Sequence, residues 1–126
     1  MQNQIFKSKE TRKYCKMHRK HRKELIKLAK ETREWDFCYL HQMVIMQIKH
    51  MYEYYSAGNN VRQPDETLNR VLKSLNQILD LQEKLNTLYD VYNISTDDLK
   101  KLDERESQLY EEIYTNIGQN IQWWWD

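Results

Sequence analysis

The order of apolar and polar residues predicts four helices. In each segment the core-type side chains recur every three or four residues, which places them along one face of a helix. In residues 8–33 this face consists of Tyr14, Met17, His18, His21, Leu25, Leu28 and Thr32. From Trp35 to about Ala57 there are two such stripes, one of Leu40, Val44, Ile48, Met51 and Tyr55 and one of Tyr39, Met43, Met46, His50 and Tyr54. A helix with two apolar sides is expected to be buried on both sides.

The third and fourth segments carry the most regular stripes. After Asp65 the spacing is close to a heptad repeat, with Leu68, Val71, Leu72, Leu75, Ile78, Leu79, Leu85 and Leu88. After Ser95 the stripe is interrupted by Glu106 and contains Leu99, Leu102, Leu109, Ile113, Ile117, Ile121 and Trp124. Both patterns are typical of core helices.

Residues with turn and capping preferences mark the helix ends. Gly58 favours a helix stop because glycine tolerates the left-handed conformation. Pro64 and Asp65 begin the next helix, and Ser95 to Asp98 supply a capping side chain and carboxylates for the first turn of the last one. The stretch Glu34-Trp35-Asp36 fits either a break or a continuous helical passage.

These elements predict an all-α fold. The short connections indicate that the last three helices pack as antiparallel neighbours, in a small helical bundle of three core helices plus a long basic N-terminal helix. Residues 1–126 then form a single helical domain, with 1–33 as the basic N-terminal helix and 34–126 as the bundle core. The presence of only two glycines and one proline in 126 residues argues against a strand-rich fold.

The composition excludes several classes of protein. No run approaches the roughly 20 apolar residues of a membrane span, and the N-terminus has no apolar export segment, so we expect a cytoplasmic protein. Cys15 and Cys38 are too few for a disulfide framework, and Cys38 is expected to pack in the core. There is no nucleophile motif and no glycine-rich phosphate loop, so no enzymatic activity and no cofactor are predicted.

A metal site is not predicted either. Cys15, His18 and His21 have helical spacing, but the surrounding lysines and arginines oppose a divalent cation. His41 and His50 are expected to be hydrogen-bonded core or boundary histidines.

Charge is distributed unevenly along the chain. Residues 7–33 contain twelve Lys and Arg against three Glu, a net charge of +9, whereas residues 34–126 contain eight against sixteen acidic residues, a net charge of −8. A cationic stripe at helical spacing consists of Arg12, Lys16, Arg19, Lys23, Lys27 and Lys30. An anionic ligand is expected to meet this stripe, unless the acidic last helix of the same or a neighbouring subunit neutralises it.

The C-terminal sequence Trp123-Trp124-Trp125-Asp126 places three indoles side by side. Because successive helical residues turn by about 100°, the three rings cannot face one core. Trp124 continues the apolar stripe, while Trp123 is expected to point into water in a monomer. The alternatives are a loosely packed chain end, a subunit interface formed by Trp123, Trp124 and Trp125, and a flat surface for a planar ligand.

Three short motifs resemble those of small uncharacterised helical proteins from tailed phages. They are Trp35-Asp36-Phe37-Cys38-Tyr39-Leu40, the following Met51-x-x-Tyr54-Tyr55 and the terminal Trp124-Trp125-Asp126. The resemblance covers residues 24–126 and leaves the basic N-terminal arm outside it. It implies a viral setting in the host cytoplasm and no particular mechanism.

In that setting we expect a non-enzymatic binding protein. The first hypothesis is a homo-oligomer that sequesters an anionic nucleotide-type ligand, such as a messenger of host defence, with phosphates on the basic helix and the base stacked on Trp35, Tyr39 or Trp123. The candidate ligand-binding residues are Arg12, Lys16, Arg19, Lys23, Arg33, Trp35 and Tyr39. The alternatives are a structural or host-protein-binding factor and a non-specific nucleic-acid-binding protein. No membrane partner is expected.

Overall fold

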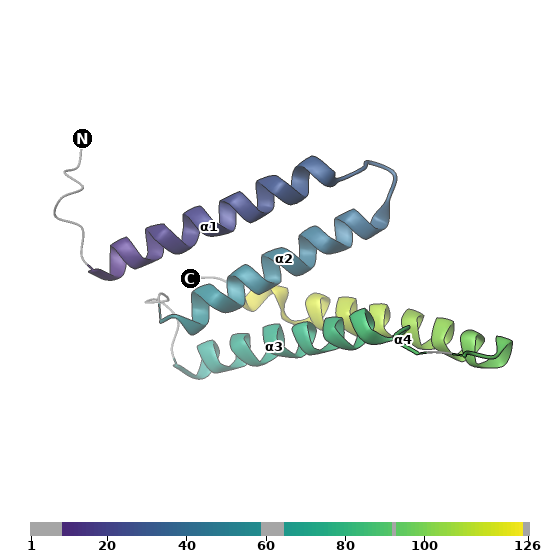
Figure 1. Cartoon of the computed structure of the whole chain (residues 1–126). Helices are drawn as coiled ribbons and strands as arrows, with labels where there is room; N and C mark the ends of the chain where they lie inside the picture. The colour runs from purple at the N-terminus through teal and green to yellow at the C-terminus, as the bar shows by residue number, and fades with distance from the viewer. Residues whose placement is uncertain (1–8, 59–64, 92, 125–126) are drawn as a thin grey trace. The chain divides into compact units, whose positions relative to one another are not determined.

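The computed structural model describes residues 9–58, 65–91 and 93–124, and their regular structure is entirely helical (Figure 1). This confirms the predicted all-α class. The chain divides into two compact units, Met1–Asn59 and Asn60–Asp126. Each unit contains one antiparallel pair of helices, so the basic helix belongs with the helix that follows it, and the division falls after Asn59 instead of after residue 33.

The first unit contains α1 (Lys9–Glu31) and α2 (Phe37–Ser56), which run antiparallel (Figure 1). The stretch Glu34-Trp35-Asp36, for which the sequence allowed two alternatives, interrupts the helix and connects α1 to α2. Asp36 caps α2, because its carboxylate accepts a hydrogen bond of 2.9 Å from the Cys38 amide. At the other end of α2, Gly58 has φ +78, as expected for a glycine that terminates a helix.

Burial along α2 differs from the predicted two-sided pattern at its first turn. Ile48, His50 and Tyr55 are buried, as the stripes predict, but Phe37 and Leu40 are about two-thirds exposed. Cys38 is also exposed, so its predicted place in the core is wrong. The physical reason is positional, because these residues open α2 next to the connection to α1. Periodicity predicts which face a residue occupies and does not predict where the partner helix ends.

The second unit contains α3 (Asp65–Thr87) and α4 (Thr96–Asn120) (Figure 1). Its core consists of five fully buried side chains, Val71, Leu75, Ile78, Leu109 and Ile113. All five belong to the predicted stripes. Ser95 caps α4, as predicted, by accepting a hydrogen bond of 3.1 Å from the Asp98 amide. Gln77 of α3 accepts a hydrogen bond of 3.3 Å from Asn116 of α4 across the pair.

Trp123 and Trp124 contact residues of α3. The α-helix gives way to a 3-10 turn, η2 (Ile121–Trp123), which changes the direction of the side chains that follow. Trp124 is half-buried, and its indole N–H donates a hydrogen bond of 2.9 Å to the Ser74 hydroxyl. Trp123 lies under the Arg70 guanidinium, 4.9 Å from the ring centroid. Trp123 is 36% exposed, as predicted, but one face of its ring is also in contact with a cation of α3. Trp125 lies outside the described residues.

We expect Trp124→Phe to lower the free energy of unfolding by about 1 kcal/mol, because it removes the N–H that the Ser74 hydroxyl accepts and keeps the apolar ring. Urea denaturation of Trp124→Phe, Ser74→Ala and the double variant measures the coupling between the two groups. Trp123→Phe is the matched control, because its ring can still meet Arg70. Additive effects of the two single substitutions would contradict the hydrogen bond.

Candidate functional site

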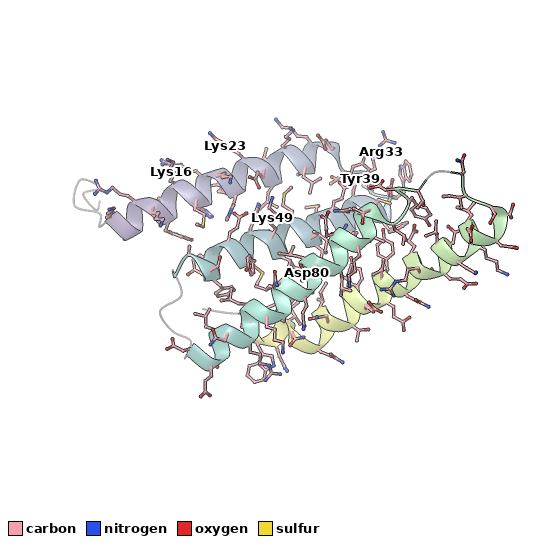
Figure 2. The ribbon with its side chains drawn as sticks, turned by 60° about the horizontal axis from the view of Figure 1, so that its bottom comes forward. Lys16, Lys23, Arg33, Tyr39, Lys49 and Asp80 are labelled. Atoms are coloured by element: carbon pink, nitrogen blue, oxygen red, sulfur yellow. The ribbon has the colours of Figure 1, made fainter. Side chains whose placement is uncertain are left out.

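The cationic stripe extends along most of α1. Its six members, Arg12, Lys16, Arg19, Lys23, Lys27 and Lys30, are all exposed. Figure 2 shows Lys16 and Lys23 on the side of α1 that faces away from α2. Within the described part of the chain, no stripe cation has a carboxylate oxygen within 4.0 Å. Six positive charges on one side of a helix create a positive potential that attracts anions.

The two units carry opposite net charges. Residues 1–59 contain 13 Lys and Arg against 6 Asp and Glu, a net charge of +7, and residues 60–126 contain 7 against 13, a net charge of −6. The near-neutral chain thus consists of a basic and an acidic compact unit. The positive charge is concentrated on α1, because α2 contributes only Lys49.

The seven predicted ligand-binding residues fall into two groups. Arg12, Lys16, Arg19 and Lys23 share one side of α1. Arg33, Trp35 and Tyr39 lie at or just after the connection to α2, where Figure 2 labels Arg33 and Tyr39. The Arg33 guanidinium is 5.7 Å from the centroid of the Trp35 ring. At 1.5 Å per helical residue, Arg12 and the end of α1 are about 29 Å apart. The structure does not bring all seven into one pocket.

An open groove accompanies the stripe along one flank of the α1–α2 pair. It has a volume of about 860 Å³ and is lined by Lys13, Lys16, Met17, Arg19, Lys20, Lys23, Glu24 and Glu53. Five of these eight residues are cationic. The two glutamates face them from the seam between the helices, where each has a histidine partner.

Two histidine–glutamate pairs, which the apolar and charge patterns did not predict, join α1 and α2. The imidazoles of His21 and His50 stack with their centroids 3.9 Å apart and their planes 10° apart. His21 Nε2 lies 2.6 Å from Glu53 Oε2, and His50 Nε2 lies 2.8 Å from Glu24 Oε2. Both helices contain the same His-x-x-Glu spacing, at 21–24 and 50–53, and antiparallel packing pairs each histidine with the glutamate of the other helix. This repeated His-x-x-Glu spacing is the sequence feature from which the two pairs could have been predicted.

Each of the two histidines has one glutamate partner. No three His, Cys, Asp or Glu side chains gather into a possible metal site anywhere in the described residues. His18 stacks on Tyr14 instead, with centroids 5.9 Å apart. The prediction that His50 is a hydrogen-bonded core histidine is confirmed, since it is 5% exposed.

The hydrogen bond from His50 lowers the pKa of Glu24 below its ordinary value of 4.5, and the charges of His50, Lys20 and Lys49 act in the same direction. A carboxyl group whose pKa is lower in the folded state stabilises that state fully above pH 4.5, and this stabilisation is lost as the pH falls below it.

We therefore expect Glu24→Gln to lower the free energy of unfolding at neutral pH, with the difference from the wild type shrinking as the pH is lowered from about 6 to about 3. Denaturant titrations followed by far-UV circular dichroism at several pH values measure this difference. Glu31→Gln, at the exposed end of α1, is the matched control. A difference that stays constant over this pH range would contradict the assigned carboxylate–imidazole pair.

A second hollow lies on the other flank of the α1–α2 pair and is aromatic. It has a volume of about 300 Å³, and the side chains around it include Tyr14, His18, His21, His50, Tyr54 and Tyr55. Tyr14 is 39% exposed. Leu25 and Met51 add apolar contacts, and Arg22 and Gln47 add polar groups. We call this hollow the aromatic pocket. The sequence pattern placed Tyr14 and Tyr54 in apolar stripes and did not predict that they line a pocket.

Comparisons of the chain with protein-family models, with curated protein sequences and with solved structures find no match. The phage setting stays a prediction from the sequence motifs. None of the helices in the described ranges is long and apolar enough to cross a membrane. The geometry of α1 and α2 is therefore the basis on which a function is proposed.

Proposed function

We propose that the first unit is a non-enzymatic binding module for nucleic acid, in which α1 contacts a run of phosphates. The observation that carries this proposal is the stripe of six exposed cations without a carboxylate neighbour among the described residues. Lysine and arginine side chains bind phosphate oxygens by charge-assisted hydrogen bonds. The contacts are to the backbone, so the binding is expected to be independent of base sequence.

The length of the stripe favours a polymer over a single nucleotide. From Arg12 to Lys30 the helix rises about 27 Å, at 1.5 Å per residue. One nucleotide cannot reach cations at both ends, whereas consecutive phosphates of a strand can contact them in turn. An exposed row of cations is also typical of backbone binding, because contacts with phosphates need no enclosed pocket.

Sequestration of a free nucleotide is the second candidate function, and the aromatic pocket favours it. Its volume of about 300 Å³ is of the size that a small ligand occupies, and its rings offer stacking surfaces. The residues involved differ from those predicted, since Tyr14 and Tyr54 take the place of Trp35 and Tyr39. In this candidate function too, the ligand is held and released unchanged.

The test of the proposal is the salt dependence of binding. For a 5′-fluorescein-labelled octathymidylate, six phosphate contacts predict that the logarithm of the association constant falls with the logarithm of the salt concentration with a slope of about −4. Fluorescence anisotropy between 50 and 300 mM NaCl measures this slope.

A slope near zero, or no binding of the intact chain at 50 mM NaCl, would overturn the proposal. Absence of binding at 50 mM NaCl would favour the alternative in which the carboxylates of α4, from the same or a neighbouring subunit, neutralise the stripe. Isothermal titration with single nucleotides addresses the second candidate function in the same buffer.

A further inference from the structure

We infer that the aromatic pocket accepts an unpaired nucleobase whose phosphates lie on the cationic stripe. This inference rests on the proposed function and adds the part of the ligand that α1 alone does not contact. The shared chemistry is a planar heterocycle that carries phosphate, and it is present both in a single strand and in a free nucleotide.

The rings of the pocket offer two kinds of contact to a planar ligand. Tyr14 and His18 are nearly parallel, at 19°, with centroids 5.9 Å apart, whereas Tyr14 and Tyr54 meet edge to face at 67° and 5.7 Å. Tyr14 is 39% exposed and His18 is exposed, so solvent reaches both rings. Aromatic side chains with accessible faces are the usual stacking partners of unpaired bases.

The floor of the pocket is held in place before a ligand arrives. His21 and His50 stack on each other at 3.9 Å, and each is fixed by a glutamate of the opposite helix. Tyr54 in turn meets Tyr55 at 5.3 Å, and Tyr55 is buried. A preformed site loses little conformational entropy on binding.

Arg22 connects the pocket to the stripe. It lines the pocket, and it is three residues from the stripe residue Arg19, so the two guanidinium groups belong to neighbouring positions on the surface of α1. A base in the pocket therefore leaves its own phosphate within the region of Arg22 and Arg19. The next phosphates of a strand can follow the stripe toward either end.

This arrangement predicts a preference for single strands. A base inside a duplex is stacked and paired, and releasing it costs free energy that a single strand does not require. Every base has a face for stacking, so the pocket is expected to tolerate all four. The stripe by itself would not distinguish a strand with bases from one without them.

The experiment compares octathymidylate with an abasic strand of the same length, using the intact chain and fluorescence anisotropy. The abasic strand carries the phosphates alone and therefore reports on the proposed function. We expect octathymidylate to bind about tenfold more tightly than the abasic strand. Tyr14→Leu is expected to remove this difference and to leave abasic binding unchanged, and Tyr14→Phe is expected to retain it. Tyr114→Leu is the matched control, because Tyr114 of α4 is 41% exposed.

Each outcome separates the two proposals. Equal binding of the two strands by the wild type would overturn the base site and leave the phosphate stripe intact. Absence of binding by both strands would overturn the stripe. Thymidine monophosphate that binds as tightly as the octamer, with the same sensitivity to Tyr14→Leu, would assign the base site to a free nucleotide. Persistence of the tenfold preference in Tyr14→Leu would place the base elsewhere and overturn the inference.

Discussion

Replacing Lys16, Arg19 and Lys23 together with glutamine is expected to weaken the binding of octathymidylate about a hundredfold at 0.1 M salt. Each phosphate contact of a single strand contributes about 0.7 to the salt slope, so the loss of three contacts lowers the slope by about 2. At 0.1 M salt, a change of 2 in the slope corresponds to about two powers of ten in the association constant. Glutamine favours helices, so α1 is expected to persist, and circular dichroism checks this.

The control for this triple variant removes the same charge from the second unit. Lys84, Lys100 and Lys101 are exposed on α3 and α4, and their replacement with glutamine changes the net charge of the chain equally. We expect the control to bind within about threefold of the wild type, because these three lysines do not belong to the cationic stripe and salt screens charges that make no phosphate contact. Equal weakening by both triple variants would show that the net charge matters and that the stripe does not.

Leu109→Ala is expected to lower the free energy of unfolding by about 3 kcal/mol. The side chain is fully buried among the core residues of the second unit, so its removal loses apolar burial and leaves a cavity. Small domains are stable by only about 5–15 kcal/mol, so this is a large fraction. With a denaturant dependence of about 2 kcal/mol per M, the urea midpoint is expected to fall by about 1.5 M.

Leu99→Ala is the matched control on the same helix. Leu99 belongs to the same predicted apolar stripe but is 45% exposed, so we expect a loss of less than about 1 kcal/mol. Circular dichroism during urea titration measures both variants. Equal losses would contradict the burial of Leu109 between α3 and α4.

The helices and most of their ends were predictable from local patterns. The stripe containing Leu75 and Ile78 needs only the helical period to be recognised, and Ser95 and Gly58 act through preferences of their own backbone. The cationic stripe was predictable for the same reason, because exposed charges at helical spacing keep their positions whatever α1 packs against.

The candidate site was predicted only in part. Four of the seven predicted ligand-binding residues lie on one side of α1, but Arg33, Trp35 and Tyr39 lie at its far end. Their grouping with Arg12 required knowledge of where the chain turns. Trp124 illustrates the same limit, since its bond to Ser74 spans 50 positions and follows a 3-10 turn that the helical period does not predict.

The sequence alone determined the helical class, the capped ends and the row of cations, because each depends on residues within a few positions of one another. Tertiary structure decided which helices pair. It thereby also decided which side chains of the paired helices meet. The stacked imidazoles of His21 and His50, the exchange of glutamates between helices and the pocket around Tyr14 arise where α1 and α2 meet. Their geometry is set by the register of two antiparallel helices, which is a property of the packed pair and of neither helix by itself.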